Sequence, residues 1–222
     1  MSLEVRDVSE RLKNEFSRRL LNWWLKKERE RLPWRETRDP YSVLVAEIML
    51  RKTDVSKVLS IYSSFLKKYP NFESIVKASE EEIMEHLKPL GIYRYRARQL
   101  KRIAELVCTR YGGELPKNLK ELIKLPGVGR YIASAIACFV WNQRVPVVDV
   151  NVIRVLSRVF NLKVGPSSHK NTKIWEFAES LLPMNLIREY NLALIDIGRH
   201  ICLPSKPKCN ACPLKEMCAY FS

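Results

Sequence analysis

Four of the six cysteines crowd into residues 202–218, and thiols at such short spacing are suited to metal chemistry. Six, two and five residues separate Cys202, Cys209, Cys212 and Cys218. Cysteines crowded in this way inside a cell favour metal ligation over disulfides. Structural zinc sites usually pair two CxxC-like knuckles, and here there is one. The spacing therefore favours a 4Fe–4S cluster, whose four irons each take one thiolate, with zinc and disulfides as the alternatives.

A short basic loop joins the first two of these cysteines. Its sequence, LPSKPK, carries Lys206 and Lys208 among two prolines. A loop tied at both ends by metal ligands can present its charge to a phosphate, or it can simply be solvated, and the residues alone leave both readings open. The remaining cysteines, Cys108 and Cys138, lie on apolar helical patterns and are interpreted as buried core thiols.

Two glycines one residue apart, Gly127 and Gly129, separate two helical patterns in LPGVGRY. Both can take positive φ and let another backbone approach closely. The second helix is expected to start near Arg130, which leaves its unpaired N–H groups and positive dipole end facing out of the turn. Such an end binds a phosphate without a side chain, although a glycine turn can also serve packing alone.

A carboxylate follows an apolar approach eighteen residues after Tyr131. Asp149 stands after three valines in VPVVDVNVIRVL and before a helical pattern. An aspartate in that place is commonly an N-cap. Catalytic acids are also often held at the mouth of an apolar cleft. The sequence leaves these two roles open.

The composition narrows the choice of partner. The 222 residues carry 39 Lys and Arg against 24 Asp and Glu, a formal net charge of +15. Lysine and arginine release counterions from phosphates, so this excess predicts a nucleic-acid partner over a merely basic surface. Apolar residues make up 46% of the chain, as in globular proteins, and no apolar run approaches the roughly 20 residues of a membrane span. The charged, helical start at residues 1–16 is unlike a secretory signal, so an intracellular location in the cytoplasm or nucleoid is expected.

Helices must position these groups. Apolar residues recur at helical spacing, β-branched alternation is scarce, and short breaks with Pro, Gly or Asp separate the segments. The predicted fold class is all-α with short connections. The expected helices cover residues 16–27, 41–50, 55–69, 80–90, 96–111, 118–125, 132–141, 150–160, 174–183 and 190–202.

The hairpin, the aspartate and the cysteine pattern together resemble the helix–hairpin–helix DNA glycosylases of the endonuclease III superfamily. The likeness covers nearly the whole chain and includes LPWRETRDPYSVLVAEIMLRKTDV, LPGVGRYIASAIACF, VPVVDVNVIRV, EYNLALIDIGRHIC and the order of the four cysteines. It implies two helical domains with a DNA-binding cleft between them. One is a six-helix bundle over residues 33–143, with the helix–hairpin–helix near 118–140. The other joins residues 1–32 to 144–222 and holds the iron–sulfur cluster in the loop 202–218.

The resemblance also implies base flipping and assigns roles to three residues. Tyr131 stands where bifunctional relatives carry a lysine and adenine-excising relatives usually a serine. A tyrosine there resembles the branch that removes thymine or uracil mispaired with guanine, and a phenol forms Schiff bases poorly, so little or no strand cleavage is expected. Glu47 matches a glutamate that faces the flipped base, where it bonds the base edge or protonates the leaving group. Asp149 matches the carboxylate that stabilises charge on the sugar. The alternatives without a catalytic role are that Tyr131 is a packing residue and that Glu47 is a surface glutamate.

Further residues are assigned to DNA contact by the same resemblance. The segment RKT at residues 51–53 stands where adenine-excising relatives usually have QQT. The wedge that fills the gap left by the flipped base is sought in GIYRYRAR, with Tyr93, Arg94 and Tyr95 as candidates, although these residues can equally form the surface at a helix start. The expected DNA-binding residues are Gly127, Gly129, Arg130, Arg51, Lys52, Lys206 and Lys208.

The predicted function is a monofunctional DNA glycosylase of base excision repair that removes thymine or uracil opposite guanine. The alternatives are an adenine-DNA glycosylase acting opposite guanine or 8-oxoguanine, and a non-catalytic helix–hairpin–helix DNA-binding protein. The chain stops four residues after Cys218, where most adenine-excising relatives continue into a further domain, which disfavours the first alternative. Asp149 disfavours the second, because a pure binder needs no carboxylate that repels phosphate. One 4Fe–4S cluster, mismatched double-stranded DNA, a monomeric state and a downstream AP endonuclease as functional partner are expected.

Overall fold

The structure is a computed structural model that describes residues 8–26, 31–165 and 171–221. Every regular element within these ranges is a helix, which confirms the all-α fold class. The charged pattern at residues 1–7 lies outside the described residues. In the part of the chain that is described, no helix combines the length and apolar character that a membrane span requires.

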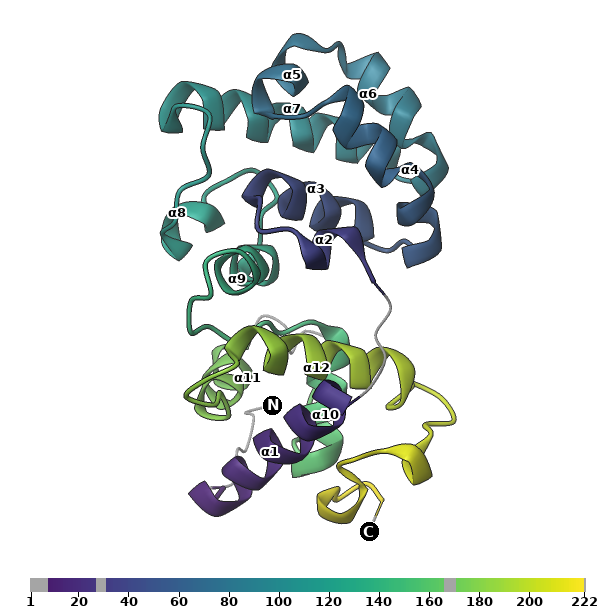
Figure 1. The fold of residues 1–222 in the computed structure, drawn as a ribbon, viewed down its shortest axis with the longest axis vertical. Coiled ribbons are helices and arrows are strands. Elements are labelled where there is room, and N and C mark those ends of the chain that lie inside the picture. The colour runs from purple at the N-terminus through teal and green to yellow at the C-terminus, as the bar shows by residue number, and fades with distance from the viewer. Residues whose placement is uncertain (1–7, 27–30, 166–170, 222) are drawn as a thin grey trace. The chain divides into compact units, whose positions relative to one another are not determined.

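The chain forms two compact units (Figure 1). The central unit runs from Glu30 to Trp141. The terminal unit joins Met1–Arg29 to Asn142–Ser222. The bundle domain predicted from the sequence starts at residue 33 and ends at residue 143.

The central unit is a bundle in which α7 packs against α5 and α6, while α3 packs against α4 and α9. Each of the expected helices between residues 33 and 143 has a counterpart, and two short helices, α2 and α5, are additional. The elements are α2 (Pro33–Glu36), α3 (Pro40–Leu50), α4 (Val55–Lys68), α5 (Phe72–Lys77), α6 (Glu80–Leu87), η1 (Lys88–Leu90), α7 (Tyr93–Tyr111), α8 (Leu119–Ile123) and α9 (Arg130–Phe139).

Helix α3 lies in the middle of this core. Asp39 caps its start by accepting from the Ser42 main-chain N–H at 2.9 Å, and Pro40 occupies the first helical position. Every residue from Val43 to Met49 is buried. A helix that is apolar on nearly all sides is typical of the interior of a protein. Helix α3 is therefore the buried helix against which α4 and α9 pack.

The additional helix α5 is specified by its cap rather than by a repeating apolar stripe. Asn71 Oδ1 accepts from the Ser74 N–H at 2.9 Å, and Ser74 Oγ accepts from the Asn71 N–H at 3.2 Å. This reciprocal capping box holds a helix of six residues, in which Phe72 and Ile75 are buried. Six residues are too few for helical periodicity to be recognised in a sequence.

The terminal unit builds its core from segments far apart in the chain. Helix α12 packs against α1 and α10. Trp24 Nε1 on α1 donates to Asp196 Oδ2 on α12 at 3.1 Å, and the rings of Phe16 and Phe160 lie 5.1 Å apart. The elements are α1 (Glu10–Lys26), α10 (Val150–Phe160), α11 (Thr172–Ser180), α12 (Ile187–His200), η3 (Cys209–Ala211) and η4 (Lys215–Met217), the last two within the cysteine segment.

Candidate functional site

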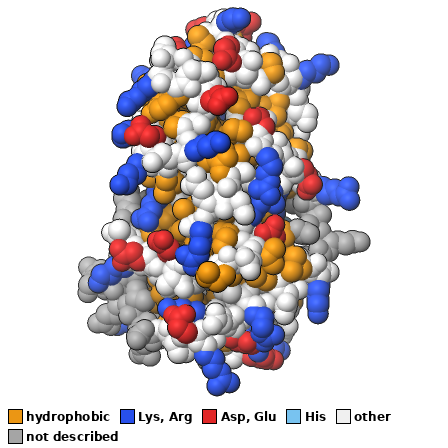
Figure 2. Space-filling view, turned by 60° about the vertical axis from the view of Figure 1, so that its left-hand side comes forward, with side chains coloured by type: hydrophobic (Ala, Val, Ile, Leu, Met, Phe, Trp, Pro, Cys, Tyr) orange, Lys and Arg blue, Asp and Glu red, His pale blue; other side chains and the backbone are white. Residues whose placement is uncertain are grey.

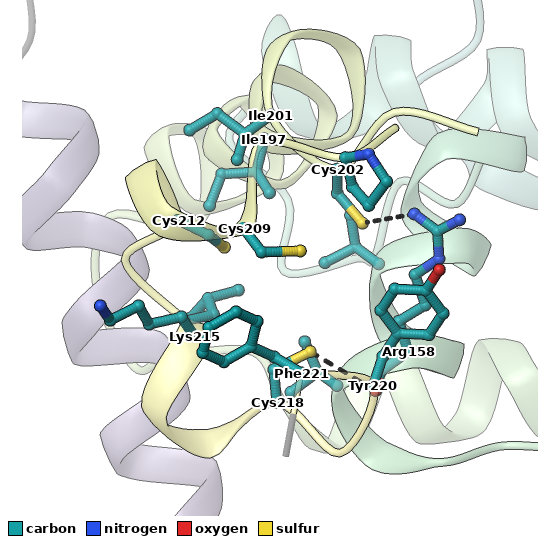
Figure 3. A pocket seen from close by; sticks show the side chains of 14 residues that line it. Arg158, Ile197, Ile201, Cys202, Cys209, Cys212, Lys215, Cys218, Tyr220 and Phe221 are labelled. Carbon is teal, nitrogen blue, oxygen red and sulfur yellow. Dashed lines mark hydrogen bonds between the residues drawn. The ribbon is translucent and has the colours of Figure 1, made fainter. Parts of the chain in front are cut away.

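The four cysteines of residues 202–218 line one pocket of the terminal unit. Figure 3 shows their sulfur atoms directed into the same hollow, which is partly open to solvent. An apolar part of its wall comes from Val155 and Val159 of α10, from Ile197 of α12 and from Ile201, which follows the end of α12. The spacing of the cysteines in the sequence thus translates into one shared site.

The four cysteines bring four thiols to one hollow, the number that a zinc ion or a 4Fe–4S cluster takes. Four thiolates on one zinc lie about 4 Å apart, because each Zn–S bond measures about 2.3 Å. Among the residues the structure describes, no group of three or more His, Cys, Asp or Glu side chains is arranged to hold a metal ion. A 4Fe–4S cluster instead takes one sulfur at each of four irons, spread around a larger body. Four thiols around a common hollow meet that requirement.

The thiols also influence one another electrostatically. Burial raises the pKa of the Cys212 thiol to about 11, the N–H of Leu214 opposes the rise, and Cys202, Cys218 and Cys209 add to it. A metal that binds here would displace the proton of Cys212, because the ligand form of cysteine is the thiolate.

The basic loop between Cys202 and Cys209 is exposed at both lysines. Lys206 has a left-handed backbone with φ 49°, and the Lys208 N–H donates to the Ile201 carbonyl at 2.9 Å. The loop therefore folds back onto the end of α12 and presents both ammonium groups to solvent, where a phosphate can reach them.

Asp149 caps the start of α10. Its Oδ1 accepts from the Val152 N–H at 2.7 Å, and its Oδ2 accepts from Asn151 Nδ2 at 2.7 Å. The N-cap role is therefore present. Burial raises the pKa of the Asp149 carboxyl, and the bonds from Val152 and Asn151 together with the charge of Arg154 offset part of that rise. A partly buried carboxylate with both oxygens fixed is suited to stabilising a developing positive charge as well as to capping.

A run of hydrogen bonds links Asp149 to the cysteine segment. Arg154 Nη2 donates to Asn151 Oδ1 at 2.8 Å and to the Gly198 carbonyl at 2.6 Å, while Arg154 Nε donates to the Cys202 carbonyl at 2.7 Å. A Cβ at Gly198 would stand 2.7 Å from the Cβ of Asn151, so glycine there lets α12 approach the start of α10. Helix α10, helix α12 and the cysteine segment therefore fix Asp149 together.

Helices α8 and α9 form the predicted helix–hairpin–helix of the central unit. Helix α9 starts at Arg130, as the sequence predicts. Gly127 has φ +71°, and a Cβ there would stand 2.6 Å from Gln99 Nε2. Gly129 is extended, with φ −81°, so only one of the two glycines uses positive φ. A Cβ at Gly129 would meet no described atom within 4 Å, which leaves the space beside the first turn of α9 open to a phosphate.

Tyr131 and Glu47 belong to neighbouring helices of the central unit. Tyr131 lies in the first turn of α9, half-buried against the core. Glu47 lies on α3, which packs against α9, and only 6% of it is exposed. This burial excludes the reading of Glu47 as a surface glutamate. A glutamate is rarely buried to that extent without a specific partner or function.

The end of α3 is linked to the hairpin through α7. Arg51 Nη1 donates to Gln99 Oε1 at 2.9 Å, and Gln99 Nε2 donates to the Pro126 carbonyl at 3.3 Å. The guanidinium of Arg51 also lies 5.4 Å from the ring centroid of Tyr95. Arg51 is thus engaged within the unit, whereas Lys52 is exposed on a left-handed turn with φ 50°. Of the two basic residues expected to meet DNA here, Lys52 is the more available.

A buried arginine ties this turn to the segment that precedes α7. Arg96 is 1% exposed, and burial lowers the pKa of its guanidinium. An unpaired guanidinium in the interior is costly, so its bonds hold both segments in one arrangement. It donates to the carbonyls of Ile48 at 3.1 Å and Leu90 at 2.9 Å, to Thr53 Oγ1 at 2.6 Å, and to the carbonyls of Gly91 and Arg51.

The wedge candidates differ in exposure. Tyr93 packs against the core, Arg94 lies over the Tyr93 ring, and Tyr95 is 52% exposed. Ile92, which is not among the candidates predicted from the sequence, is 51% exposed and has φ 41°. A β-branched residue in the left-handed region is strained and persists only where its surroundings fix it, as Arg96 does here.

Three residues that hold the candidate site in place are also not among the site residues predicted from the sequence. They are Asn151, Arg154 and Arg96. Arg154 and Arg158 are four residues apart on the mostly apolar segment VNVIRVLSRVF, so they share a helix face. This pair of arginines is the one feature of the sequence that points to a supporting role on α10. The same pattern is equally typical of a helix face exposed to solvent. Arg96 is one of several basic residues in RYRARQ, and nothing in the sequence marks it as the buried one.

Residues 45–180 match the family described as HhH-GPD superfamily base excision DNA repair protein. The chain belongs to this family, which confirms the resemblance seen in the sequence. The chain is 38% identical over 215 residues to the thymine/uracil-DNA glycosylase of Methanothermobacter thermautotrophicus, covering 97% of each. It is 36% identical over 206 residues to an adenine DNA glycosylase of Buchnera aphidicola subsp. Baizongia pistaciae, covering 93% of this chain and 58% of that one. The solved structure of a thermostable thymine-DNA glycosylase matches with a TM-score of 0.90 at 38% identity, covering 97% of this chain and 99% of that one.

Proposed function

We propose that the protein is a monofunctional DNA glycosylase that flips thymine or uracil mispaired with guanine out of duplex DNA and hydrolyses its N-glycosidic bond. The similarity to a thymine/uracil-DNA glycosylase over 97% of both chains carries this proposal. Membership of a base excision repair family supports N-glycosylase chemistry. The placement of Tyr131 at the start of α9 and of Asp149 at the start of α10 supports the mismatch-specific, hydrolytic form of it.

Asp149 supplies the charge that the reaction needs. Breaking the N-glycosidic bond builds positive charge on the deoxyribose, and a fixed carboxylate stabilises that charge or activates the attacking water. Its two bonds from Val152 and Asn151 hold the oxygens still, so little reorganisation is required when the charge appears. The raised pKa of Asp149 makes it a better proton acceptor than an ordinary aspartate.

Glu47 and Tyr131 recognise the flipped base. A pyrimidine leaves as an anion more readily when donors meet the negative charge that develops on its ring. The Tyr131 phenol donates a hydrogen bond, and the Glu47 carboxyl either bonds the base edge or delivers a proton. Neither side chain is an amine, so neither forms a Schiff base with the sugar.

The DNA backbone is held by main-chain N–H groups and by scattered cations. The open space at Gly129 exposes the N-terminal N–H groups of α9 to a phosphate of the damaged strand. Figure 2 shows Lys and Arg side chains spread across the visible face, with acidic side chains between them. Lys52, Lys206 and Lys208 are exposed cations that support this binding.

A 4Fe–4S cluster is the cofactor that we assign to the cysteine pocket. The ligands are Cys202, Cys209, Cys212 and Cys218, which share one hollow. When bound, the cluster supplies a cross-link for a segment whose only regular elements are two short 3-10 helices. With all four irons ligated by cysteine, the role is structural support of the basic loop and of the contacts to Arg154.

The wedge is assigned to Ile92. An apolar side chain inserted between base steps fills the gap left by a flipped base, and isoleucine is among the residues that do so. Ile92 is half-exposed and fixed in a strained conformation, whereas Tyr93 is packed against the core. Ile92→Ala should weaken the preference for mismatched over matched duplex, with Val76→Ala on α5 as the control for loss of an exposed β-branched residue.

The deciding experiment is base release from a panel of duplexes that differ in one pair. T·G, U·G, A·G and A·8-oxoguanine duplexes are each scored before and after alkali, with a matched duplex as the control. Release from T·G and U·G, with strand breaks only after alkali, is expected. Release confined to the adenine pairs would establish the adenine glycosylase instead. Tight duplex binding without release from any pair would indicate a non-catalytic DNA-binding protein.

A further inference from the structure

Arg158 reaches from α10 to one end of the cysteine segment (Figure 3). Its Nη1 donates to the Cys202 sulfur at 3.4 Å and to the Leu203 carbonyl at 2.7 Å, and its Nη2 donates to the Pro204 carbonyl at 2.9 Å. A cation and an N–H donor therefore lie directly against one of the four proposed ligand sulfurs.

The other end of the segment is held by the main chain of the same residue. The Arg158 carbonyl accepts from the Tyr220 N–H at 3.1 Å, and the Cys218 thiol lies 3.6 Å from that carbonyl. The side chain of Arg158 also stacks on Tyr220, with 4.6 Å between the guanidinium carbon and the ring centroid. Arg158 thus connects the first and the last cysteine of the segment.

Two aromatic rings form the outer side of the pocket. Tyr220 and Phe221 line the hollow that the sulfurs face, yet 56% of Tyr220 and 45% of Phe221 is exposed. Each ring therefore faces the pocket on one side and solvent on the other. Lys215 lies over the Phe221 ring at 6.0 Å, as Arg158 does over Tyr220. Each aromatic ring is thus stacked against a cation from the wall of the pocket.

These contacts have a defined effect on thiolate-bound iron. Hydrogen bonds to the sulfurs, nearby charge and access of solvent set the reduction potential of an iron–sulfur cluster. An N–H···S bond from a cation stabilises the state that holds more electrons, so it makes loss of an electron less favourable. A ring over the pocket slows the approach of water and of dissolved oxidants.

We propose that Arg158, supported by Tyr220, protects the cluster against oxidation by donating to the Cys202 sulfur and by holding the Tyr220 ring over the pocket. This inference rests on the assignment of a 4Fe–4S cluster in the proposed function. The opposing reactant is a one-electron oxidant such as ferricyanide. One electron passes from the cluster to ferricyanide, which becomes ferrocyanide, and no proton or heavy atom is transferred in that step.

Four variants of the full chain separate the parts of this proposal. Arg158→Met keeps an unbranched apolar side chain and removes the charge and the donors. Lys215→Met is the matched control, because Lys215 lines the same pocket and its described contact is with a ring rather than with sulfur. Arg158→Lys restores a charge and a donor without the planar stack. Tyr220→Leu removes the ring and leaves Arg158 in place.

Each protein is purified anaerobically, its iron is counted, its cluster potential is measured by voltammetry, and bleaching of its visible absorbance by ferricyanide is timed. Arg158→Met should retain about four irons per chain. Its oxidation should become about tenfold more favourable, which is about 59 mV for a one-electron couple, and its bleaching should be faster. Lys215→Met should shift the potential less, and Arg158→Lys should fall between Arg158→Met and the wild type. Tyr220→Leu should bleach faster with a smaller change in potential.

Equal shifts in Arg158→Met and Lys215→Met would mean that only net charge matters, and would overturn the proposal. An unchanged potential and bleaching rate in iron-loaded Arg158→Met would overturn it as well. If Arg158→Met fails to hold iron, Arg158→Lys and Tyr220→Leu provide the test instead. A wild-type potential and a wild-type bleaching rate in both variants would refute the protective role of Arg158 and Tyr220. Wild-type protein without iron would overturn the cofactor assignment and this inference together, whereas an iron-loaded wild type isolates the role of Arg158.

Discussion

Arg154 donates a hydrogen bond of 2.7 Å from Nε to the main-chain carbonyl of Cys202, and through it the cysteine segment is connected to Asp149. The same guanidinium donates to Asn151 Oδ1 at 2.8 Å, and Asn151 donates to Asp149 at 2.7 Å. A shift of the Cys202 carbonyl can therefore move the Asp149 carboxylate through the side chains of Arg154 and Asn151. The cysteine segment thus has a physical route by which it affects the proposed chemistry.

Replacing Arg154 by methionine should lower base release from T·G duplex by about tenfold, or about 1.4 kcal/mol in the activation barrier. Asn151 would lose one of its anchors, so Asp149 Oδ2 would be held less firmly, while Oδ1 keeps its bond from the Val152 N–H. Single-turnover base release measures the effect, with iron content and duplex affinity recorded for the same protein.

The matched control for this change is Arg144→Met. Arg144 also donates to a main-chain carbonyl of the terminal unit, that of Leu182 at 3.0 Å, but it does not bond Asn151. Its loss should leave base release near the wild-type rate. If Arg154→Met releases thymine as fast as the wild type, the connection from Cys202 to Asp149 has no bearing on catalysis.

Asp149→Asn separates chemistry from capping. Asparagine caps a helix as well as aspartate does, but it carries no charge. Base release should fall by at least ~10²-fold, the scale of a lost electrostatic contact in a transition state. Binding to T·G duplex should hold or improve, because one repulsion with phosphate is removed. A nearly neutral effect on base release would identify Asp149 as a helix cap only.

The same substitution should raise the melting temperature at neutral pH. Burial raises the pKa of Asp149 in the folded protein, so folding favours the protonated carboxyl, and this contribution is lost as the pH rises through the folded-state pKa. The ionised form at neutral pH therefore costs stability, which asparagine avoids. The difference between wild type and Asp149→Asn should shrink as the pH falls, and a constant difference across pH would contradict a charge effect.

The pH dependence of base release should show an acid limb set by Asp149. The ionised carboxylate is the active form, so base release should fall as the pH drops through a pKa above the ordinary aspartate value of 3.8. The charge of Arg154 lowers the pKa of Asp149, so Arg154→Met should move this limb to higher pH. Single-turnover rates across pH measure the acid limb of the wild type and that of Arg154→Met. A limb that Arg154→Met leaves in place would mean that another group controls it.

Local patterns account for the parts of the molecule that the sequence predicted well. The all-α class follows from helical periodicity, and the shared pocket of the cysteines follows from short loops that cannot separate their ends by much. The start of α9 at Arg130 follows from the glycine turn before it. In each case the information lies within a few consecutive residues.

Contacts between distant segments account for what the sequence did not show. Arg154 reaches Cys202 from 48 positions away, and Arg96 reaches Ile48 across the same separation. No spacing rule marks such partners. Gly129 shows a related limit, because a glycine chosen for open space looks in sequence like one chosen for positive φ, as Gly127 is. Exposure and strain at Ile92 likewise emerge only when the chain around it is folded.

The two hairpin glycines should respond differently to alanine. Gly129→Ala places a methyl group in open space beside the α9 N-terminus, so it should weaken binding to matched and mismatched duplex alike, since a phosphate contact carries no sequence information. Gly127→Ala is strained by φ +71° and meets Gln99, so it should also lower the melting temperature. Duplex affinity and thermal melting are measured for both. If Gly129→Ala weakens only the binding of mismatched duplex, the hairpin does not bind the phosphate backbone of DNA.

Tyr131→Lys tests whether the first turn of α9 selects the chemistry. Under the proposed function, the wild-type phenol cannot form a Schiff base, so abasic strands should stay intact until alkali is added. A lysine at this position brings an amine to the sugar, and should introduce strand nicking and a protein–DNA adduct that borohydride traps. Tyr131→Phe is the matched control, because it keeps the ring against the core and should give no adduct. An equal yield of adduct from wild type and Tyr131→Lys would mean that another amine attacks the sugar. The complete absence of an adduct from Tyr131→Lys, in a protein that still binds duplex, would place residue 131 away from the reacting sugar.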